Sequence, residues 1–97
     1  MVSEEEKRSA SKEKIITNFR KAHSLLQRVE KMVREDRYCI EIMQQNLAVM
    51  GLLRSAHEML MRRHLETCFK DAFQSQDQKR QQEMIEEILK VTRLFNR

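Results

Sequence analysis

Residues 40–64 read IEIMQQNLAVMGLLRSAHEMLMRRH, and this stretch decides the fold. It contains one glycine and no proline, so nothing in it ends a helix. Its apolar residues cover more than one face of such a helix, which indicates that the helix packs against two neighbours. We therefore expect one helix over residues 39–73, packed on a helix of its own chain and on a second chain. Gly51 then marks either a close helix crossing or a slight bend.

Regular apolar patterns also occur on both sides of this stretch. From Lys12 to Val33 apolar residues recur at steps of four and three, which predicts an amphipathic helix over residues 12–35 with Ser11 as its N-cap. Residues 1–11 lack such a period, and we expect a flexible N-terminal arm there. A polar run at 74–82 precedes a shorter apolar pattern, which predicts a third helix over residues 80–95.

These elements predict an all-α protein with a single domain over residues 12–97. The chain has 97 residues, of which 35% are charged and 5% aromatic, so a single copy has little material for a core. Association is therefore expected. Two three-helix protomers can form an antiparallel four-helix bundle by pairing their first and second helices, and we expect this homodimer to form a homotetramer as a dimer of dimers.

Composition and charge exclude several classes of protein. The sequence has no secretory or transmembrane run, so we expect a cytoplasmic protein without a membrane partner, whose two cysteines are free thiols. It has no glycine-rich loop and no nucleophile elbow, and we expect no enzyme. The formal net charge is +4, with the basic excess in residues 1–38. This charge suits a phosphate backbone, although a solvated helix face fits almost as well.

His64 and Cys68 are four residues apart, so on a helix they lie about one turn apart on one face. Imidazole nitrogen and thiolate sulfur together suit Cu(I) or Zn(II), but on spacing alone such a pair is more often part of a core. Cys39 lies 25 residues before His64, which on one helix is roughly 37 Å. One chain cannot close the site, whereas two antiparallel chains would give two equivalent three-ligand sites across a two-fold axis.

Three pieces of the sequence together resemble the copper-sensitive operon repressor family, which comprises small all-α metal sensors. These pieces are Tyr38-Cys39, His64-Leu65-Glu66-Thr67-Cys68-Phe69 and Ile85-Glu86-Glu87, and the resemblance covers about residues 12 to 95. It implies dimers that form flat tetramers, bind operator DNA without a helix-turn-helix, and release it on binding Cu(I). The positions that match the family's copper ligands are Cys39, His64 and Cys68.

The resemblance also implies roles for residues outside the ligand set. Tyr38 and Glu87 match outer positions that hydrogen-bond to the ligand histidine and couple the site to the DNA-binding surface. A carboxylate there fixes the tautomer of the imidazole. The chain is about two residues longer than common relatives between Cys68 and Glu87, so Glu86 and Glu83 are alternatives for this role.

The DNA-binding side departs from the family pattern. Arg20 and Lys21 match a basic pair in the first helix, whereas Asn18 and Ser24 do not match their family counterparts. The second helix has Ser55 where relatives often carry an arginine, with an arginine one step away. The residues that we expect to contact DNA are Arg20, Lys21, Lys14, Arg54 and Arg62.

Two functions follow from this reading. The first is a metal-responsive transcriptional repressor, most simply a Cu(I) sensor that also takes Zn(II) in vitro, which binds operator DNA in the apo form and releases it with metal bound. The alternative is a helical, oligomeric metal-binding or thiol-switch protein that does not bind DNA. Binding to the promoter of its own operon, with and without Cu(I), separates the two.

Overall fold

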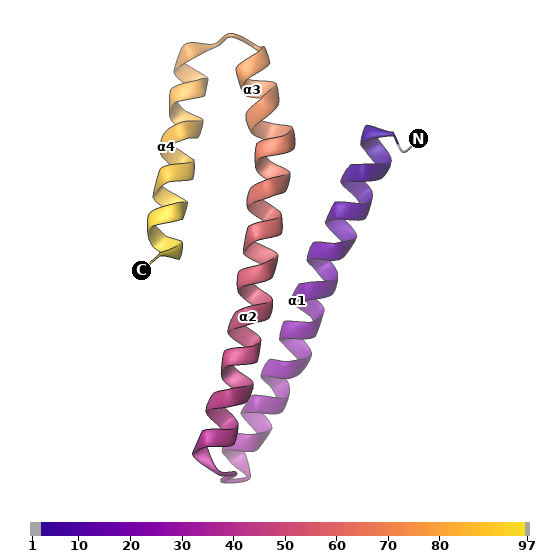
Figure 1. Cartoon of the computed structure of the whole chain (residues 1–97), viewed down its shortest axis with the longest axis vertical. Coiled ribbons are helices and arrows are strands. Elements are labelled where there is room, and N and C mark those ends of the chain that lie inside the picture. The colour runs from indigo at the N-terminus through magenta and orange to yellow at the C-terminus, as the bar shows by residue number, and fades with distance from the viewer. Residues whose placement is uncertain (1–2, 97) are drawn as a thin grey trace. The chain divides into compact units, whose positions relative to one another are not determined.

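The computed structural model describes residues 3–96, and helices are the only regular elements in that range (Figure 1). The elements in chain order are α1 (Glu4–Arg34), α2 (Cys39–His64), a π-helical turn η1 (Leu65–Phe69), α3 (Lys70–Gln74) and α4 (Gln78–Phe95). The second predicted helix is thus a continuous helical run from Cys39 to Gln74 with a π turn inside it. The all-α prediction is confirmed.

The first helix begins earlier than its apolar period predicts. Ser3 is the N-cap, and its Oγ accepts a hydrogen bond of 3.1 Å from the backbone N–H of Glu6. Three consecutive glutamates fill the first turn, where carboxylates interact favourably with the positive end of the helix dipole. These findings correct the predicted start at Lys12 and the predicted cap at Ser11. Of the predicted arm, residues 1 and 2 lie outside the described residues.

The end of α1 is a hydrogen-bonded turn built on a left-handed residue. Asp36 has φ 54°, and its N–H donates to the carbonyl of Val33 at 3.1 Å. The N–H of Arg37 donates to the carbonyl of Met32 at 3.0 Å. This pair of bonds is the Schellman arrangement, which satisfies the last carbonyls of a helix and reverses the chain. The position of this turn sets the start of α2 at Cys39, as the sequence predicts.

The chain divides into two compact units at Met61, where a single domain was predicted. In the first unit, α1 and α2 pack on each other through a core of Ala22, Val29 and Val49. Ile15, Ala22 and Val29 are seven residues apart and buried, whereas Phe19, Leu26 and Val33, also seven apart, are 41%, 50% and 56% exposed. Only one of the two apolar rows on α1 is therefore covered within a single chain.

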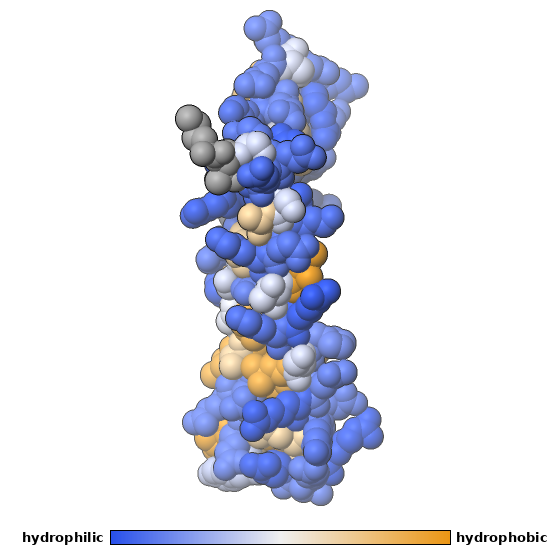
Figure 2. Space-filling view, turned by 90° about the vertical axis from the view of Figure 1, so that its right-hand side faces the viewer, coloured by the Kyte–Doolittle hydropathy of each residue, from blue (hydrophilic) through white to orange (hydrophobic). Residues whose placement is uncertain are grey.

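The second helix shows the same division. Val49 is buried against Ala22 and Val29 of α1, and Ala56 is buried as well. Its large exposed apolar residues in this unit are Ile40, Met43, Leu47, Met50, Leu53 and Leu60. Figure 2 shows one face of the molecule, on which hydrophobic side chains lie open among hydrophilic ones. The first unit therefore retains the second apolar face that the sequence predicts for α2.

Gly51 lies in open space within the single chain. A Cβ atom added there would meet no heavy atom within 4 Å, so no helix in residues 3–96 crosses closely at this position. We expect Gly51→Ala to raise the free energy of unfolding by about 0.5–1 kcal/mol, since alanine has the higher helix propensity. Urea denaturation measures this change.

The control for this substitution is Ala48→Gly, an exposed position on the same helix, which should lower the free energy of unfolding by a similar amount. If Gly51→Ala instead destabilises the protein, a second chain packs closely against α2 at this point.

The second unit begins at Arg62 and contains η1, α3 and α4. α4 begins after the N-cap Asp77, whose Oδ1 accepts from the N–H of Arg80 at 3.2 Å. The rings of Phe69 and Phe73 lie with centroids 4.4 Å apart, and Met84 of α4 is buried at 2% exposure. Gln81 Nε2 of α4 donates a hydrogen bond of 3.3 Å to the carbonyl of Phe73 in α3, and the two helices pack on each other.

Candidate functional site

The three predicted metal ligands lie in two places in the chain. Cys39 is the first residue of α2, in the first unit, and its thiol is exposed. His64 is the last residue of α2 and half-buried, and Cys68 lies in η1 with an exposed thiol. His64 and Cys68 thus belong to the second unit. Within residues 3–96, no three His, Cys, Asp or Glu side chains are grouped closely enough to hold a metal ion.

The π-helical turn lies at the predicted ligand pair. A π turn closes its hydrogen bonds over five residues instead of four, and such turns occur frequently at functional sites. Within this run Thr67 Oγ1 donates to the carbonyl oxygen of Arg63 at 2.7 Å, the usual arrangement for a threonine inside a helix. The hydroxyl oxygen of Thr67 lies 3.6 Å from the Cys68 sulfur. Residues four apart, such as His64 and Cys68, remain about one turn apart in this arrangement.

Both thiols are free, so the donor set fits a soft metal ion. An exposed thiol at each position is accessible to groups from another molecule. The residues present therefore offer two sulfurs and one nitrogen, a set suited to Cu(I), provided that two chains contribute them.

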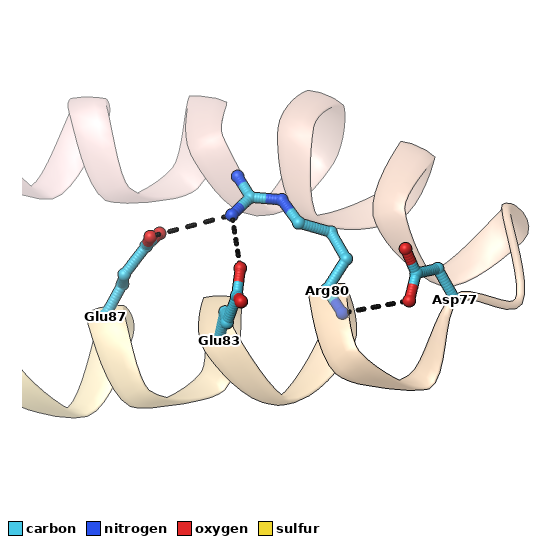
Figure 3. A network of polar contacts seen from close by, with 4 residues as sticks. All are labelled: Asp77, Arg80, Glu83 and Glu87. Carbon is cyan, nitrogen blue, oxygen red and sulfur yellow. Dashed lines mark hydrogen bonds and ion pairs between the residues drawn. The ribbon is translucent and has the colours of Figure 1, made fainter.

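Figure 3 shows Glu83 and Glu87, two of the three carboxylates of α4 that are candidate partners of His64. Arg80 Nη1 lies 3.3 Å from Glu83 Oε2 and 3.7 Å from Glu87 Oε1. The carboxylate of Glu86 instead accepts a hydrogen bond of 3.5 Å from the side chain of Gln82. Glu83 and Glu87 therefore share a cation, and Glu86 lies outside this group. All three belong to the same unit as His64.

Tyr38 immediately precedes α2 in the first unit. Tyr38 is 69% exposed. Its carbonyl accepts the first hydrogen bond of the helix, from the N–H of Ile42 at 3.2 Å. The backbone of Tyr38 therefore anchors the start of α2 beside Cys39. Its phenol projects from an exposed position and, like the two thiols, is accessible to a second chain.

The predicted DNA-contacting residues also fall into two groups. Arg20, Lys21 and Lys14 are exposed on α1, and Arg54 is exposed on α2, all in the first unit. Arg62 is exposed in the second unit. Lys14 and Lys21 line a groove of about 390 Å³ between α1 and α2. The structure thus brings most of the predicted basic residues onto one helix pair.

The first unit contains two larger grooves. One of about 660 Å³ is mostly apolar and is lined by residues that include Phe19, Leu26 and Leu53. The other, of about 630 Å³, is lined by polar residues of α1 together with Leu25 of α1 and Leu52 of α2. It includes Arg28, which the sequence analysis did not single out. Arg28 lies seven residues after Lys21, a spacing that places both on one face of a helix and that would have identified it.

The apolar content of the helices is modest. Among residues 3–96, no helix is long and apolar enough to cross a membrane.

Comparison with known proteins identifies the family. A sequence model of the family described as metal-sensitive transcriptional repressor matches residues 11–93. This chain belongs to that family. The resemblance in the sequence to copper-sensitive operon repressors is therefore confirmed, and the matched range contains all of the predicted ligand residues. Metal-sensitive transcriptional repressors are regulators and not enzymes, in agreement with the expectation from the sequence.

Several relatives within the family are named copper-sensing transcriptional repressor CsoR. The Bacillus subtilis (strain 168) protein is 29% identical over 91 residues, which cover 94% of this chain and 87% of the relative. The Mycobacterium tuberculosis (strain ATCC 25618 / H37Rv) protein is 31% identical over 64 residues, covering 66% of this chain and 54% of the relative. This chain thus spans about half the length of the mycobacterial relatives that it matches. No solved structure matches the chain.

Proposed function

We propose that the protein is a copper-responsive transcriptional repressor, whose apo form binds operator DNA and whose Cu(I) form releases it. The observation that carries this proposal is the presence of Cys39, His64 and Cys68 in a chain of the metal-sensitive repressor family. Relatives that are similar over most of this chain bear the name of copper sensors. We expect the protein to act in the cytoplasm, where its thiols stay reduced.

The choice of metal follows from the donor atoms. Two thiolates and one imidazole form a soft set that favours Cu(I), while structural zinc prefers four ligands. Zn(II) is expected to bind in vitro because the same donor types suit it. When bound, Cu(I) would join Cys39 of one chain to His64 and Cys68 of another. X-ray absorption should then show at least two sulfur neighbours, and a four-coordinate metal would contradict the assignment.

A second copy of the chain suits the uncovered apolar rows of the first unit. The row Phe19, Leu26 and Val33 on α1 is exposed, and the apolar groove of about 660 Å³ runs beside it. Apolar residues that recur every seven positions on two antiparallel helices form a four-helix bundle when a second pair of helices packs on them. This supports a homodimer that places ligands from two chains together. We propose that two such dimers associate as a dimer of dimers.

The coupling between metal and DNA depends on the histidine. A ligand imidazole uses one nitrogen for the metal and donates its other N–H to a carboxylate, carbonyl or water. We propose that Glu87 accepts that N–H and that Tyr38 takes part from the start of α2, with Glu86 and Glu83 as alternatives to Glu87. The carboxylate of Glu87 would leave Arg80 in doing so, at little cost because the ion pair is about half-exposed.

The DNA surface in this proposal contains Arg20, Lys21, Lys14, Arg54 and Arg62. Lysine and arginine contacts of this kind position a protein on the phosphate backbone and add no sequence discrimination by themselves. A change in helix packing on metal binding would move these charges away from the phosphates. By linkage, DNA must weaken copper binding by the same factor by which copper weakens DNA binding.

The decisive experiment is a salt-titrated binding isotherm of the apo protein on the promoter of its own operon and on a random duplex. We expect the promoter to bind more tightly, and one Cu(I) per chain to weaken promoter binding by roughly 5–150-fold, the usual range of allosteric coupling. Equal affinity for both duplexes at every salt concentration would favour the alternative function.

That alternative is a metal-binding or thiol-switch oligomer without DNA binding. The exposure of both cysteines favours it, because exposed thiols are open to oxidation as well as to metal ions. A protein that binds Cu(I) or changes its oligomeric state on oxidation, yet shows no preference for its promoter, would belong to this class.

A further inference from the structure

The groove of about 630 Å³ in the first unit contains a set of polar side chains that no part of the copper site uses. Its polar lining comes entirely from α1 and consists of Thr17, Arg20, Lys21, Ser24 and Arg28. Leu25 of α1 and Leu52 of α2 complete it. Three cations thus border one open groove, and its lining residues all belong to a single unit.

These three cations are not neutralised by neighbouring carboxylates. Elsewhere on α1, Lys31 pairs with Glu35 at 3.8 Å and Arg34 pairs with Glu30 at 2.9 Å. Within residues 3–96 the structure has no ion pair to Arg20, Lys21 or Arg28. The basic residues at the end of α1 are therefore compensated, whereas those of the groove leave a net positive field for an anionic partner.

The hydroxyl groups in the groove differ in what they can donate. Thr17 Oγ1 donates its proton to the carbonyl of Glu13 at 2.8 Å, the usual arrangement for a threonine inside a helix. Ser24 makes no such bond among the described residues. Its hydroxyl is exposed and keeps its proton for a ligand. Ser24 is thus the hydroxyl donor of the groove, in line with Lys21 and Arg28 on the helix.

The arrangement suits a row of phosphates better than one small anion. Arg20 and Arg28 are eight residues apart, which corresponds to about 12 Å along a helix axis. Double-stranded DNA presents a phosphate about every 3.4 Å of its axis on each strand, so several phosphates fall within that length. Ser, Arg and Lys side chains are the usual phosphate contacts in protein–DNA complexes.

Association of two copies would leave the Arg28 side of this groove open, whereas Arg20 and Ser24 also line the apolar groove beside the exposed row. Arg28 follows Leu26 by two residues, which is about 200° around a helix, so the two side chains leave α1 on opposite sides. A second chain packed on the exposed row that contains Leu26 therefore does not cover Arg28.

We propose that Ser24 and Arg28 extend the pair Arg20 and Lys21 into a groove on α1 that binds the phosphate backbone of duplex DNA. This assignment rests on the proposed DNA binding and adds two contacts to it. Because phosphate contacts carry no sequence information, it applies to any duplex and does not depend on the operator sequence.

The test compares Arg28→Gln with Arg34→Gln in the full-length apo protein. Both variants remove one arginine charge from α1, but Arg34 lies outside the groove and is already paired with Glu30. Binding to a random duplex is measured by fluorescence anisotropy across a series of salt concentrations. Arg28→Gln should reduce the slope of log affinity against log salt by about 0.9 and weaken low-salt binding roughly tenfold. Arg34→Gln should change neither.

Ser24→Ala provides a second variant that leaves the charge unchanged. It should weaken binding roughly fivefold, as expected for one lost hydrogen bond to a charged group, without changing the salt slope. Circular dichroism spectra confirm that each variant is folded. Equal effects of Arg28→Gln and Arg34→Gln would overturn the proposal, even if the protein still distinguishes its promoter from random DNA.

A third arm separates this inference from the proposed function. Inorganic phosphate is titrated into the labelled protein, and the amide signals of Ser24 and Arg28 are followed by nuclear magnetic resonance. Saturable shifts with phosphate, together with no binding to any duplex, would replace the DNA groove by a small-anion site. Random-duplex binding that depends on Arg28 but is unaffected by copper would uphold the groove and contradict the copper-responsive repressor.

Discussion

Cys39→Ala and Cys68→Ala should each abolish tight Cu(I) binding, and a mixture of the two proteins should recover it in part. Loss of a partner outside the coordination sphere typically lowers metal affinity by 10–100-fold, so loss of a thiolate ligand should exceed about 100-fold. Competition with a chromogenic Cu(I) chelator measures the affinity. His23→Ala is the control, because it removes an exposed imidazole on α1 that belongs to no predicted ligand set.

The mixture tests whether the ligands come from two chains. In a mixed dimer, one site lacks both cysteines and the other has Cys39 from one chain with His64 and Cys68 from its partner. One of its two sites is therefore intact. Random exchange makes about half of the dimers mixed, so about a quarter of all sites should bind Cu(I) tightly, as follows from two-fold symmetry.

Mass-tagged chains show whether subunits have exchanged. No recovery of Cu(I) binding in a fully exchanged mixture would exclude a site shared between chains. Such an outcome would also require a different third ligand within the chain, although residues 3–96 contain no cluster of three candidate ligands.

His64→Ala should keep the repressor on its operator when copper is present. The two cysteines still offer sulfur ligands, so some copper remains bound, but the imidazole N–H that links the ligand set to the helices is lost. The wild-type protein should lose roughly 5–150-fold in operator affinity on binding Cu(I), whereas the variant should change by less than about twofold. Anisotropy titrations of the operator, with and without Cu(I), measure both ratios.

Glu87→Gln and Glu83→Gln form a matched pair for the same prediction. Each carboxylate contacts Arg80, so both variants lose one half-exposed ion pair of small energetic effect. The coupling between copper and DNA should fall only in the variant that replaces the residue accepting the imidazole N–H. We expect this loss for Glu87→Gln and not for Glu83→Gln. The opposite result would assign the role to Glu83, and an unchanged coupling in both would point to Glu86 or exclude the mechanism.

The sequence by itself was enough to predict where the helices lie and which residues are the candidate ligands. The apolar period from Lys12 to Val33 predicted α1, and the start of α2 at Cys39 was predicted correctly. Hydrogen bonds in a helix join residues that are close in sequence, so the apolar period alone is enough to identify a helix. The early start of α1 was also encoded locally, in Ser3 followed three residues later by Glu6, but it lies outside any apolar pattern.

Only the tertiary structure decided which of the apolar and polar faces are used. The sequence of α1 contains two equally apolar rows, and contact with α2 buries Ala22 and leaves Leu26 half exposed. The same contact places Leu52 of α2 in one groove with Lys21 and Arg28 of α1. The packing of α4 places the side-chain amide of Gln81 at the carbonyl of Phe73 in α3. These features join residues on different elements or select one face from several. Periodicity within one helix leaves them undetermined, because it gives the faces of a helix but not the partner that each face meets.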